Sequence, residues 1–251
     1  MNITFKKLFS SAAICAALAM SNAHAANDVT LKVIGNIVPG SCVPSLPNGG
    51  VVDYGTMPAS TINPTGTANT LVQLGAKSIT LTITCDSDTS VGVTSTDNRH
   101  DTRVGLGSAA YIENGFFDNV NANASGNAYG LGKTSAGVNI GSYVIAADPV
   151  NTTTDGVVAD LIAATGTDTS NYTWVKSSTG AFAPVNSGTG QTRVFTAAAS
   201  GTTTPKAFKV MNMPLRITTA LQDNTVLGTG DTITLDGNAT LSLVYLYIRY
   251  C

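Results

Sequence analysis

Two cysteines, Cys42 and Cys85, constrain the fold of this chain more than any other feature. The stretch that ends at Cys85 reads Ser-Ile-Thr-Leu-Thr-Ile-Thr-Cys and alternates apolar with hydroxyl residues. Period-two alternation is typical of a half-buried strand, so it places the Cys85 sulfur on the core side. A disulfide to Cys42 would close a loop of about 44 residues, worth about 4 kcal/mol in the chain-entropy model. We predict this bond, which is typical of an exported protein.

The N-terminus has the pattern of a cleaved secretory signal. Lys6 and Lys7 precede an apolar run over residues 8–20, which is too short to span a bilayer, and small residues lie before an expected cut at Ala26. No later stretch is long and apolar enough for a transmembrane segment. We therefore expect residues 1–25 to be removed and the mature protein to reach the periplasm or the cell surface.

Composition favours an all-β protein and argues against several functions. Without residues 1–25 the chain keeps 11 of its 13 basic residues and all 15 acidic ones, a net charge of −4. The Lys and Arg residues are scattered singly, so no nucleic-acid partner is expected. Thr, Ala, Gly, Asn, Val and Ser dominate, which suits short strands joined by polar turns.

The order of apolar stretches predicts one sandwich domain over residues 26–251. Within it, residues 118–205 are expected to hold loop-rich insertions, because small and polar residues dominate between strands there. The expected strands cover residues 29–33, 51–55, 78–85, 91–94, 143–145, 172–175, 209–211, 215–217 and 232–235.

The last apolar stretch is unusual because both of its faces are apolar. Leu241, Leu243 and Tyr245 form one face, continued by Tyr247, and the residues between them form the other. Such a strand is either central in a sandwich or exposed for pairing with another chain. The sequence leaves both interpretations open.

Several short motifs follow one another along nearly the whole mature chain. They are Gly35-x-Ile37 ahead of Cys42, Asp53-Tyr54-Gly55, Leu-Thr-Ile-Thr-Cys ending at Cys85, Asp97-Asn98-Arg99, residues 129–132, residues 140–143, Trp174 and residues 235–245. The motifs around Gly35, Asp53 and Cys85, together with residues 239–245, resemble the framework of chaperone-usher pilus subunits. More closely, the chain resembles a fimbrial-like proteobacterial family of unknown function, of the GltF type.

This resemblance implies an immunoglobulin-like, pilin-type sandwich that lacks its final strand. A periplasmic chaperone would cover the resulting groove, and an outer-membrane usher would then exchange it for the N-terminal extension of a neighbouring fimbrial subunit. Pairing of this kind is β-augmentation. The candidate donor strand is residues 26–34, with Val29, Leu31 and Val33 as the inserting side chains. The C-terminal assembly strand would carry Leu241, Leu243 and Tyr245.

The residues also allow an alternative function. If residues 29–33 are needed for the first strand, or if residues 247–251 close the domain, the protein would be a self-contained periplasmic or secreted adhesin. Such a module would recognise a host or surface glycan or a protein through the loops of residues 118–205. Cys251 is then either a thiol for intermolecular pairing or an incidental terminal residue.

No enzyme chemistry is expected from this sequence. His100 is the sole histidine after the signal and lies in a polar stretch, and Glu113 is the sole glutamate, so no acid–base constellation is visible. Asp86 and Asp88 flank a serine, but the glycine and bidentate glutamate of an EF-hand are missing. We therefore predict no catalytic residue, no metal site and no cofactor.

Overall fold

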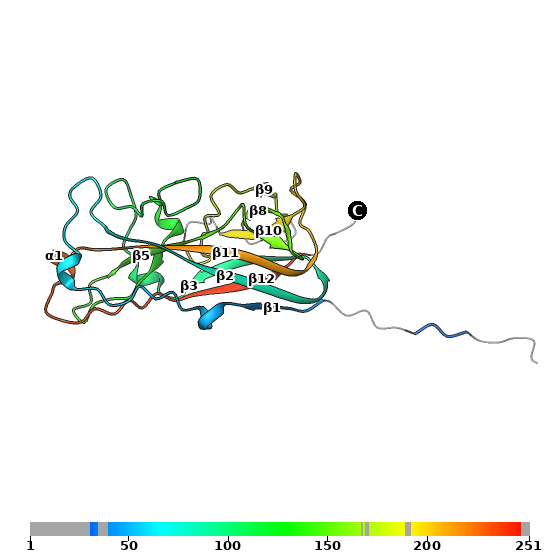
Figure 1. The fold of residues 1–251 in the computed structure, drawn as a ribbon, viewed down its shortest axis with the longest axis horizontal. Helices are drawn as coiled ribbons and strands as arrows, with labels where there is room; N and C mark the ends of the chain where they lie inside the picture. The colour runs from blue at the N-terminus through cyan, green and yellow to red at the C-terminus, as the bar shows by residue number, and fades with distance from the viewer. Residues whose placement is uncertain (1–30, 35–39, 167, 169–170, 189–191, 247–251) are drawn as a thin grey trace, which may run out of the picture. The chain divides into compact units, whose positions relative to one another are not determined.

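The computed structural model describes residues 31–34, 40–166, 168, 171–188 and 192–246. It divides the chain into two compact units, Met1–Val38 and Pro39–Cys251. Two antiparallel sheets build the second unit, with long loops between several strands (Figure 1). The expected all-β sandwich class is therefore confirmed.

The larger sheet has the strand order β1-β2-β11-β5-β4, and the β6–β7 hairpin adds to it along β11. Its strands are β1 (Cys42–Ser45), β2 (Val72–Thr89), β4 (Tyr129–Gly130), β5 (Gly141–Ala147), β6 (Thr153–Thr154), β7 (Val157–Val158) and β11 (Phe208–Leu221). Cys42 lies directly opposite Cys85 in the β1–β2 register.

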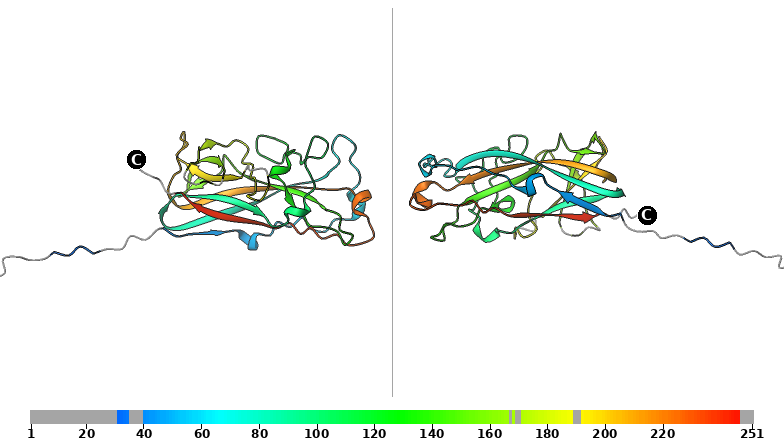
Figure 2. Two further views of the ribbon diagram at one scale, coloured as in Figure 1. Left: turned by 180° about the vertical axis from the view of Figure 1, so that it is seen from behind. Right: turned by 60° about the horizontal axis from the view of Figure 1, so that its bottom comes forward.

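The smaller sheet has the order β12-β3-β10-β8-β9 and lies over the larger one (Figure 2). Its strands are β3 (Val91–Asp97), β8 (Asp160–Thr165), β9 (Val175–Lys176), β10 (Arg193–Ala198) and β12 (Ala239–Tyr245). Helical turns occur at Pro47–Gly50, Ala59–Thr61, His100–Thr102, Ser125–Asn127 and α1 (Asn224–Leu227). β1 and β12 therefore end the two sheets on one side of the sandwich.

The main core lies between the sheets and follows the alternation of the strands. Leu81 and Ile83 of β2 and Met213 of β11 are fully buried from one sheet, and Val93 and Phe195 from the other. Burying an apolar side chain of this size stabilises a fold by about 1.5–3 kcal/mol. This layer is consequently the main source of stability.

A second apolar cluster covers the outer face of the larger sheet. Leu106, Ile112 and Phe116, from the loop that precedes β4, pack against Val144 of β5. All seven residues of β5 are buried as a result. The span 118–205 contains β4 to β10, so it holds more regular structure than its small, polar composition suggests.

Some of the expected strands are present and others are not. Those around Ile79, Val91, Tyr143 and the C-terminus are confirmed as β2, β3, β5 and β12. Residues 51–55 and 232–235 are not strands, and of the expected strand 172–175 only Val175 belongs to one, β9. A strand needs a main-chain partner, and local alternation does not supply it.

The two expected strands at residues 209–211 and 215–217 are one continuous strand, β11. Pro214 separates them in the sequence and lies opposite Thr80 of β2. Its carbonyl accepts a hydrogen bond from the N–H of Asp148, just beyond the end of β5. A residue's N–H and C=O point to the same side of a strand, so the N–H that proline lacks would also have faced Asp148. Because β5 has already ended there, no ladder hydrogen bond is lost and β11 continues through Pro214.

The structure contains the predicted Cys42–Cys85 disulfide, with both residues buried. The expected first strand is wrong for the residues described there, because Leu31–Ile34 has no strand structure and the first strand is β1. Leu31 and Val33 are 86% and 90% exposed. The signal, Val29, the tail 247–251 and Cys251 lie outside the described residues.

Candidate functional site

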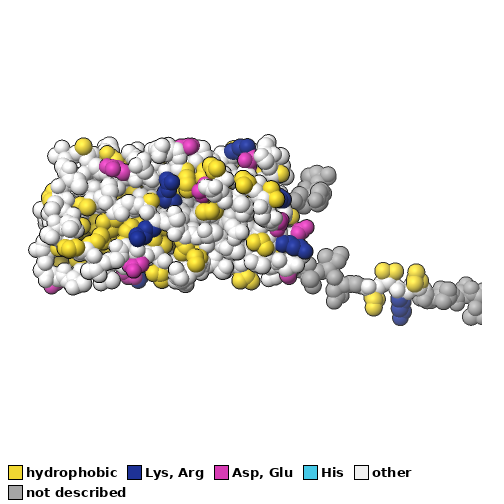
Figure 3. Space-filling model, viewed as in Figure 1, with side chains coloured by type: hydrophobic (Ala, Val, Ile, Leu, Met, Phe, Trp, Pro, Cys, Tyr) yellow, Lys and Arg dark blue, Asp and Glu magenta, His cyan; other side chains and the backbone are white. Residues whose placement is uncertain are grey.

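An open groove runs between the two sheets on the side where β1 and β12 end them. Its volume is about 980 Å³. Ile145 of β5 and Leu215 and Ile217 of β11 form its floor, and Leu241 of β12 borders it. Hydrophobic side chains are visible in a band at the end of the unit that carries α1 (Figure 3). The floor residues themselves are buried beneath the residues that line the groove.

One end of the groove is closed by covalent and hydrogen bonds. The disulfide holds β1 against β2, and the Cys42 N–H donates a hydrogen bond to the Tyr245 hydroxyl at 3.0 Å. Tyr245 belongs to β12, so this contact joins the edge strands of both sheets. The side of the sandwich is therefore sealed at this end.

Beyond Ser45 the chain leaves β2 and the groove opens. Asn48, Gly49 and Gly50 have φ angles of 51°, 65° and 82°. This left-handed turn suits glycine and asparagine, and it directs the backbone away from the sheet. Residues 51–57, here called the wall segment, then run along the groove.

The wall segment is extended but is not paired as a strand. Among the described residues, the main-chain groups of residues 52–57 make no hydrogen bond to another strand. Its principal anchor is the Tyr54 hydroxyl, which lies 2.8 Å from the Ile217 carbonyl and 3.2 Å from that of Gly75. Burial raises the pKa of Tyr54 above its ordinary value, so this anchor stays protonated at neutral pH.

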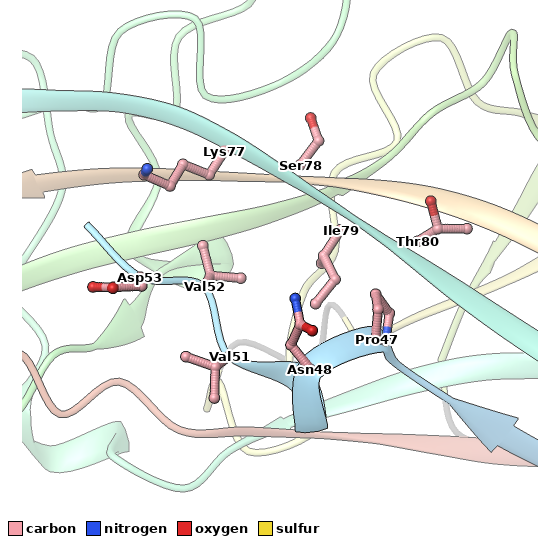
Figure 4. Close-up of a pocket in the computed structure, with 9 residues that line it drawn as sticks. All are labelled: Pro47, Asn48, Val51, Val52, Asp53, Lys77, Ser78, Ile79 and Thr80. Atoms are coloured by element: carbon pink, nitrogen blue, oxygen red, sulfur yellow. The ribbon is translucent and has the colours of Figure 1, made fainter. Parts of the chain in front are cut away.

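A smaller pocket of about 350 Å³ separates the wall segment from β2. Ile79 points from β2 toward Val52 and Asn48, while Lys77 lies farther along the same strand (Figure 4). Before Thr82, the edge of β2 that faces away from β11 has no strand partner among the described residues. A lysine on such an edge disfavours pairing with another chain.

The opposite wall is the C-terminal part of the chain, residues 229–241. The Arg99 guanidinium pairs with the Asp236 carboxylate, and the Asn98 N–H donates to the Asn238 carbonyl. β12 then pairs with β3 through seven residues and, in the described structure, has no strand on its other side. This wall is held firmly and presents a free strand edge to the groove.

The floor changes character along the groove. Ile145, Leu215 and Ile217 are apolar, whereas Tyr143 and Thr219, which face each other across β5 and β11, are polar. Burial, with a smaller effect of the Asp97 charge, raises the pKa of Tyr143, so its phenol is neutral. The charged residues that line the groove are Asp53 and Asp231. Beyond the Tyr143–Thr219 pair the lining is apolar again at Leu221 and Leu227, so a largely uncharged, apolar segment would match this surface.

The predicted assembly residues take three different positions. Leu241 lines the groove, Leu243 packs against the main core opposite Val93, and Tyr245 bonds to Cys42. The sequence did not single out Tyr54 or Tyr143 as groove residues. Both occur within motifs that were noted, but their roles depend on strands that are distant in the sequence.

His100 and Asp86, which were considered for catalysis and metal binding, make hydrogen bonds to groups beside them. His100 lies 2.9 Å from the Asp101 carboxylate and 2.6 Å from the Arg103 guanidinium, in a partly exposed turn. Asp86 accepts hydrogen bonds from the Ser41 N–H and the Ser87 hydroxyl. Across the described part of the chain, no group of three or more His, Cys, Asp or Glu residues could hold a metal ion. No helix described there is long and apolar enough to cross a membrane.

Comparisons with known proteins identify relatives over nearly the whole chain. Protein GltF of Escherichia coli (strain K12) is 41% identical, in an alignment of 96% of this chain and 99% of that protein. Uncharacterized protein YhcF of the same strain is 31% identical, over 90% and 93% of the two chains. No solved structure matches significantly. Residues 31–144 match the model "Protein of unknown function (DUF1120)", and with relatives of this identity and coverage the chain belongs to the DUF1120 family.

Proposed function

We propose that this protein is an exported structural or minor subunit of a surface fimbria, assembled by donor-strand exchange. The observation that carries the proposal is the open groove, whose apolar floor lies beside the free edge of β12. The disulfide supports export, because such bonds persist in oxidising compartments.

An inserted β-strand would fill both the unpaired edge of β12 and the space above the apolar floor. Its main chain would pair with the free edge of β12, and every second side chain would cover the floor at Ile145, Leu215 and Ile217. In this proposal the second unit is an immunoglobulin-like, pilin-type sandwich that lacks one strand. A periplasmic chaperone holds the groove until an outer-membrane usher delivers the neighbouring subunit.

The proposed donor is the N-terminal segment of a neighbouring fimbrial subunit, with residues 26–34 of this chain as the pattern. Leu31 and Val33 are almost fully exposed, and Val29 precedes Leu31 by two residues, at the same spacing. Apolar side chains at such spacing lie on one face of an extended strand. Exposed in this way, they are suited to insertion.

The test is binding of a fluorescent peptide of residues 26–37 to the mature protein, followed by anisotropy and thermal unfolding. Saturating peptide should raise the unfolding temperature, because a ligand present at 100 times its Kd stabilises the folded state by about 2.7 kcal/mol. A Leu31→Asp peptide should not bind. A Lys32→Asp peptide, altered on the other face, is the matched control and should bind. A cooperative, stable monomer that ignores the unaltered peptide would contradict the proposal.

That outcome would favour the second candidate, a self-contained adhesin that binds a glycan. The supporting observation is the pair Tyr172 and Trp174, whose partly exposed rings lie 5.3 Å apart next to β9. Aromatic faces of this kind offer apolar contact to a ligand while their polar atoms hydrogen-bond. Under this alternative, Trp174→Ala would abolish retention on a glycan array, whereas a fimbrial subunit without receptor activity would show no retention to lose.

A further inference from the structure

We propose that the wall segment covers the apolar floor in the free protein and moves onto the unpaired edge of β2 when a strand enters the groove. The inference rests on the proposed function and adds the step that opens the groove. The moving element is residues 51–57, and its destination lies across the small pocket that separates it from β2.

The apolar floor is covered in the described structure. Ile145, Leu215 and Ile217 line the groove, yet each is at most 9% exposed. On one side the cover is the wall segment, whose Val52 and Met57 side chains pack against the main core. A strand that is to bury its own side chains on this floor must first displace such a cover.

The two walls of the groove are held with unequal strength. In residues 229–241, Asp236 pairs with the Arg99 guanidinium, and its N–H donates to the Leu131 carbonyl. In the wall segment, every hydrogen bond to a strand among the described residues is made by one group, the Tyr54 hydroxyl. The wall segment is therefore the wall that can leave the floor.

Fixed points bound the wall segment on both sides, and a turn gives it freedom between them. The disulfide holds β1 in front of it, and behind it the Asn224 side-chain amide donates to the Ala59 carbonyl at 3.1 Å. The turn Pro47–Gly50 contains three consecutive residues with positive φ, and a Cβ placed at Gly49 would meet nothing within 4 Å. Such a turn can absorb the changes in φ and ψ that a movement of the segment requires.

The edge of β2 across the small pocket offers a main-chain partner. The Pro214 carbonyl, opposite Thr80, bonds to Asp148 and not to β2, so Pro214 and Thr80 are not a hydrogen-bonded pair. The N–H and C=O groups of Thr80, and those of Ser78 two residues before it, therefore face the free edge. Both residues line the pocket of about 350 Å³ that lies beside the wall segment.

Movement of the wall segment into this pocket exchanges one set of contacts for another. Its main chain gains the ladder that it lacks and continues the β1–β2 pairing along the same edge. The apolar side chains of the entering strand replace Val52 and Met57 on the floor, so apolar burial is conserved. The Tyr54 hydrogen bonds are lost, and this cost of opening lowers the apparent affinity for the strand.

Residue-resolved hydrogen exchange of the mature protein, with and without the peptide of residues 26–37, tests the movement. Saturating peptide should slow exchange at the Ser78 and Thr80 amides, and within residues 52–57, by about tenfold or more, because these groups become paired. Leu81, already paired with β11, is the control and should not change. If peptide binds but Ser78 and Thr80 exchange as before, or if they slow while residues 52–57 do not, the inference is wrong and the proposed function stands.

Tyr54→Phe tests the anchor, because it keeps the ring and removes only the hydroxyl. The wall segment should then leave the floor more easily, so the variant should bind the peptide about three- to tenfold more tightly. Tyr172→Phe is the matched control, because Tyr172 lies next to β9 and does not line the groove, and its affinity should be unchanged. Equal or weaker binding by Tyr54→Phe would show that the wall segment does not compete with the strand. If the unaltered protein binds no peptide, both the inference and the proposed function are wrong.

Discussion

The closed and open ends of the gap between the two sheets are built from neighbouring parts of the same chain. At the closed end, β1 is paired with β2, bonded to it by the Cys42–Cys85 disulfide and joined to β12 through Tyr245. At the open end, the wall segment runs past β2 without pairing, and Tyr54 provides its main anchor. The change occurs within the single turn Pro47–Gly50.

The difference shows how one sandwich can be sealed at one end and still hold a groove at the other. The covalent bond and the strand pairing hold the edges together at one end, whereas at the other end the wall segment borders a groove above Ile217. Exposed strand edges are ordinarily blunted, and here Lys77 protects β2 while β12 stays free. The three predictions below test this contrast, beginning with the largest expected effect.

Removing the disulfide should abolish the contrast by opening the closed end. Cys42→Ala with Cys85→Ala releases a link across 43 positions, which should lower the free energy of unfolding by about 4 kcal/mol. Urea unfolding followed by circular dichroism measures the loss. Cys251→Ala is the matched control and should change nothing. A loss below about 1 kcal/mol in the double variant would mean that β1 is held mainly by other contacts.

Acidic substitutions along β12 should separate stability from binding. Leu243→Asp places a carboxylate against the core and should cost about 2–4 kcal/mol, with loss of chaperone capture as a consequence. Leu241→Asp lies in the groove, where water reaches it, so it should cost less stability but still prevent peptide binding. Ser242→Asp, on the exposed face, is the control. Equal stability losses at positions 241 and 243 would argue against an open groove.

Tyr245→Phe should give the smallest effect, by removing only the hydrogen bond from the Cys42 N–H. The expected loss is about 1 kcal/mol, with faster hydrogen exchange at the Cys42 amide, because that N–H loses its partner. Native-state exchange measured residue by residue would detect it. Unchanged protection at Cys42 would show that Tyr245 does not join the two edge strands in solution.

Local patterns in the sequence predicted some strands of this fold correctly and others wrongly. Two stretches show the reason for the difference. Residues 78–85 alternate apolar with hydroxyl side chains, residues 51–55 contain Val51, Val52 and Tyr54, and both stretches were expected to be strands. The first lies in β2, between β1 and β11, whereas the second has no main-chain partner in the described structure. Alternation predicts which face a side chain takes, but pairing depends on segments far along the chain.

The candidate site also combines features that the sequence predicted with features that it did not. The sequence predicted the disulfide and the C-terminal strand, because the alternation that ends at Cys85 and the apolar pattern of residues 239–245 are local. The groove could not be predicted in this way, since its floor, its walls and Tyr143 come from β5, β11, the wall segment and β12, which are separated by up to two hundred residues. The Tyr54 and Tyr245 hydroxyls also find their partners across such distances.

By itself, the sequence determined that this protein is all-β, that Cys42 and Cys85 can meet, and which faces of β2 and β12 are apolar. These properties follow from side-chain alternation and composition, which act locally. Only the tertiary structure decided that β1 ends at Ser45, that β11 continues through Pro214, and that a groove stays open beside β12. Those outcomes depend on which strand edges find partners, and that is a property of the assembled sheets rather than of any single stretch.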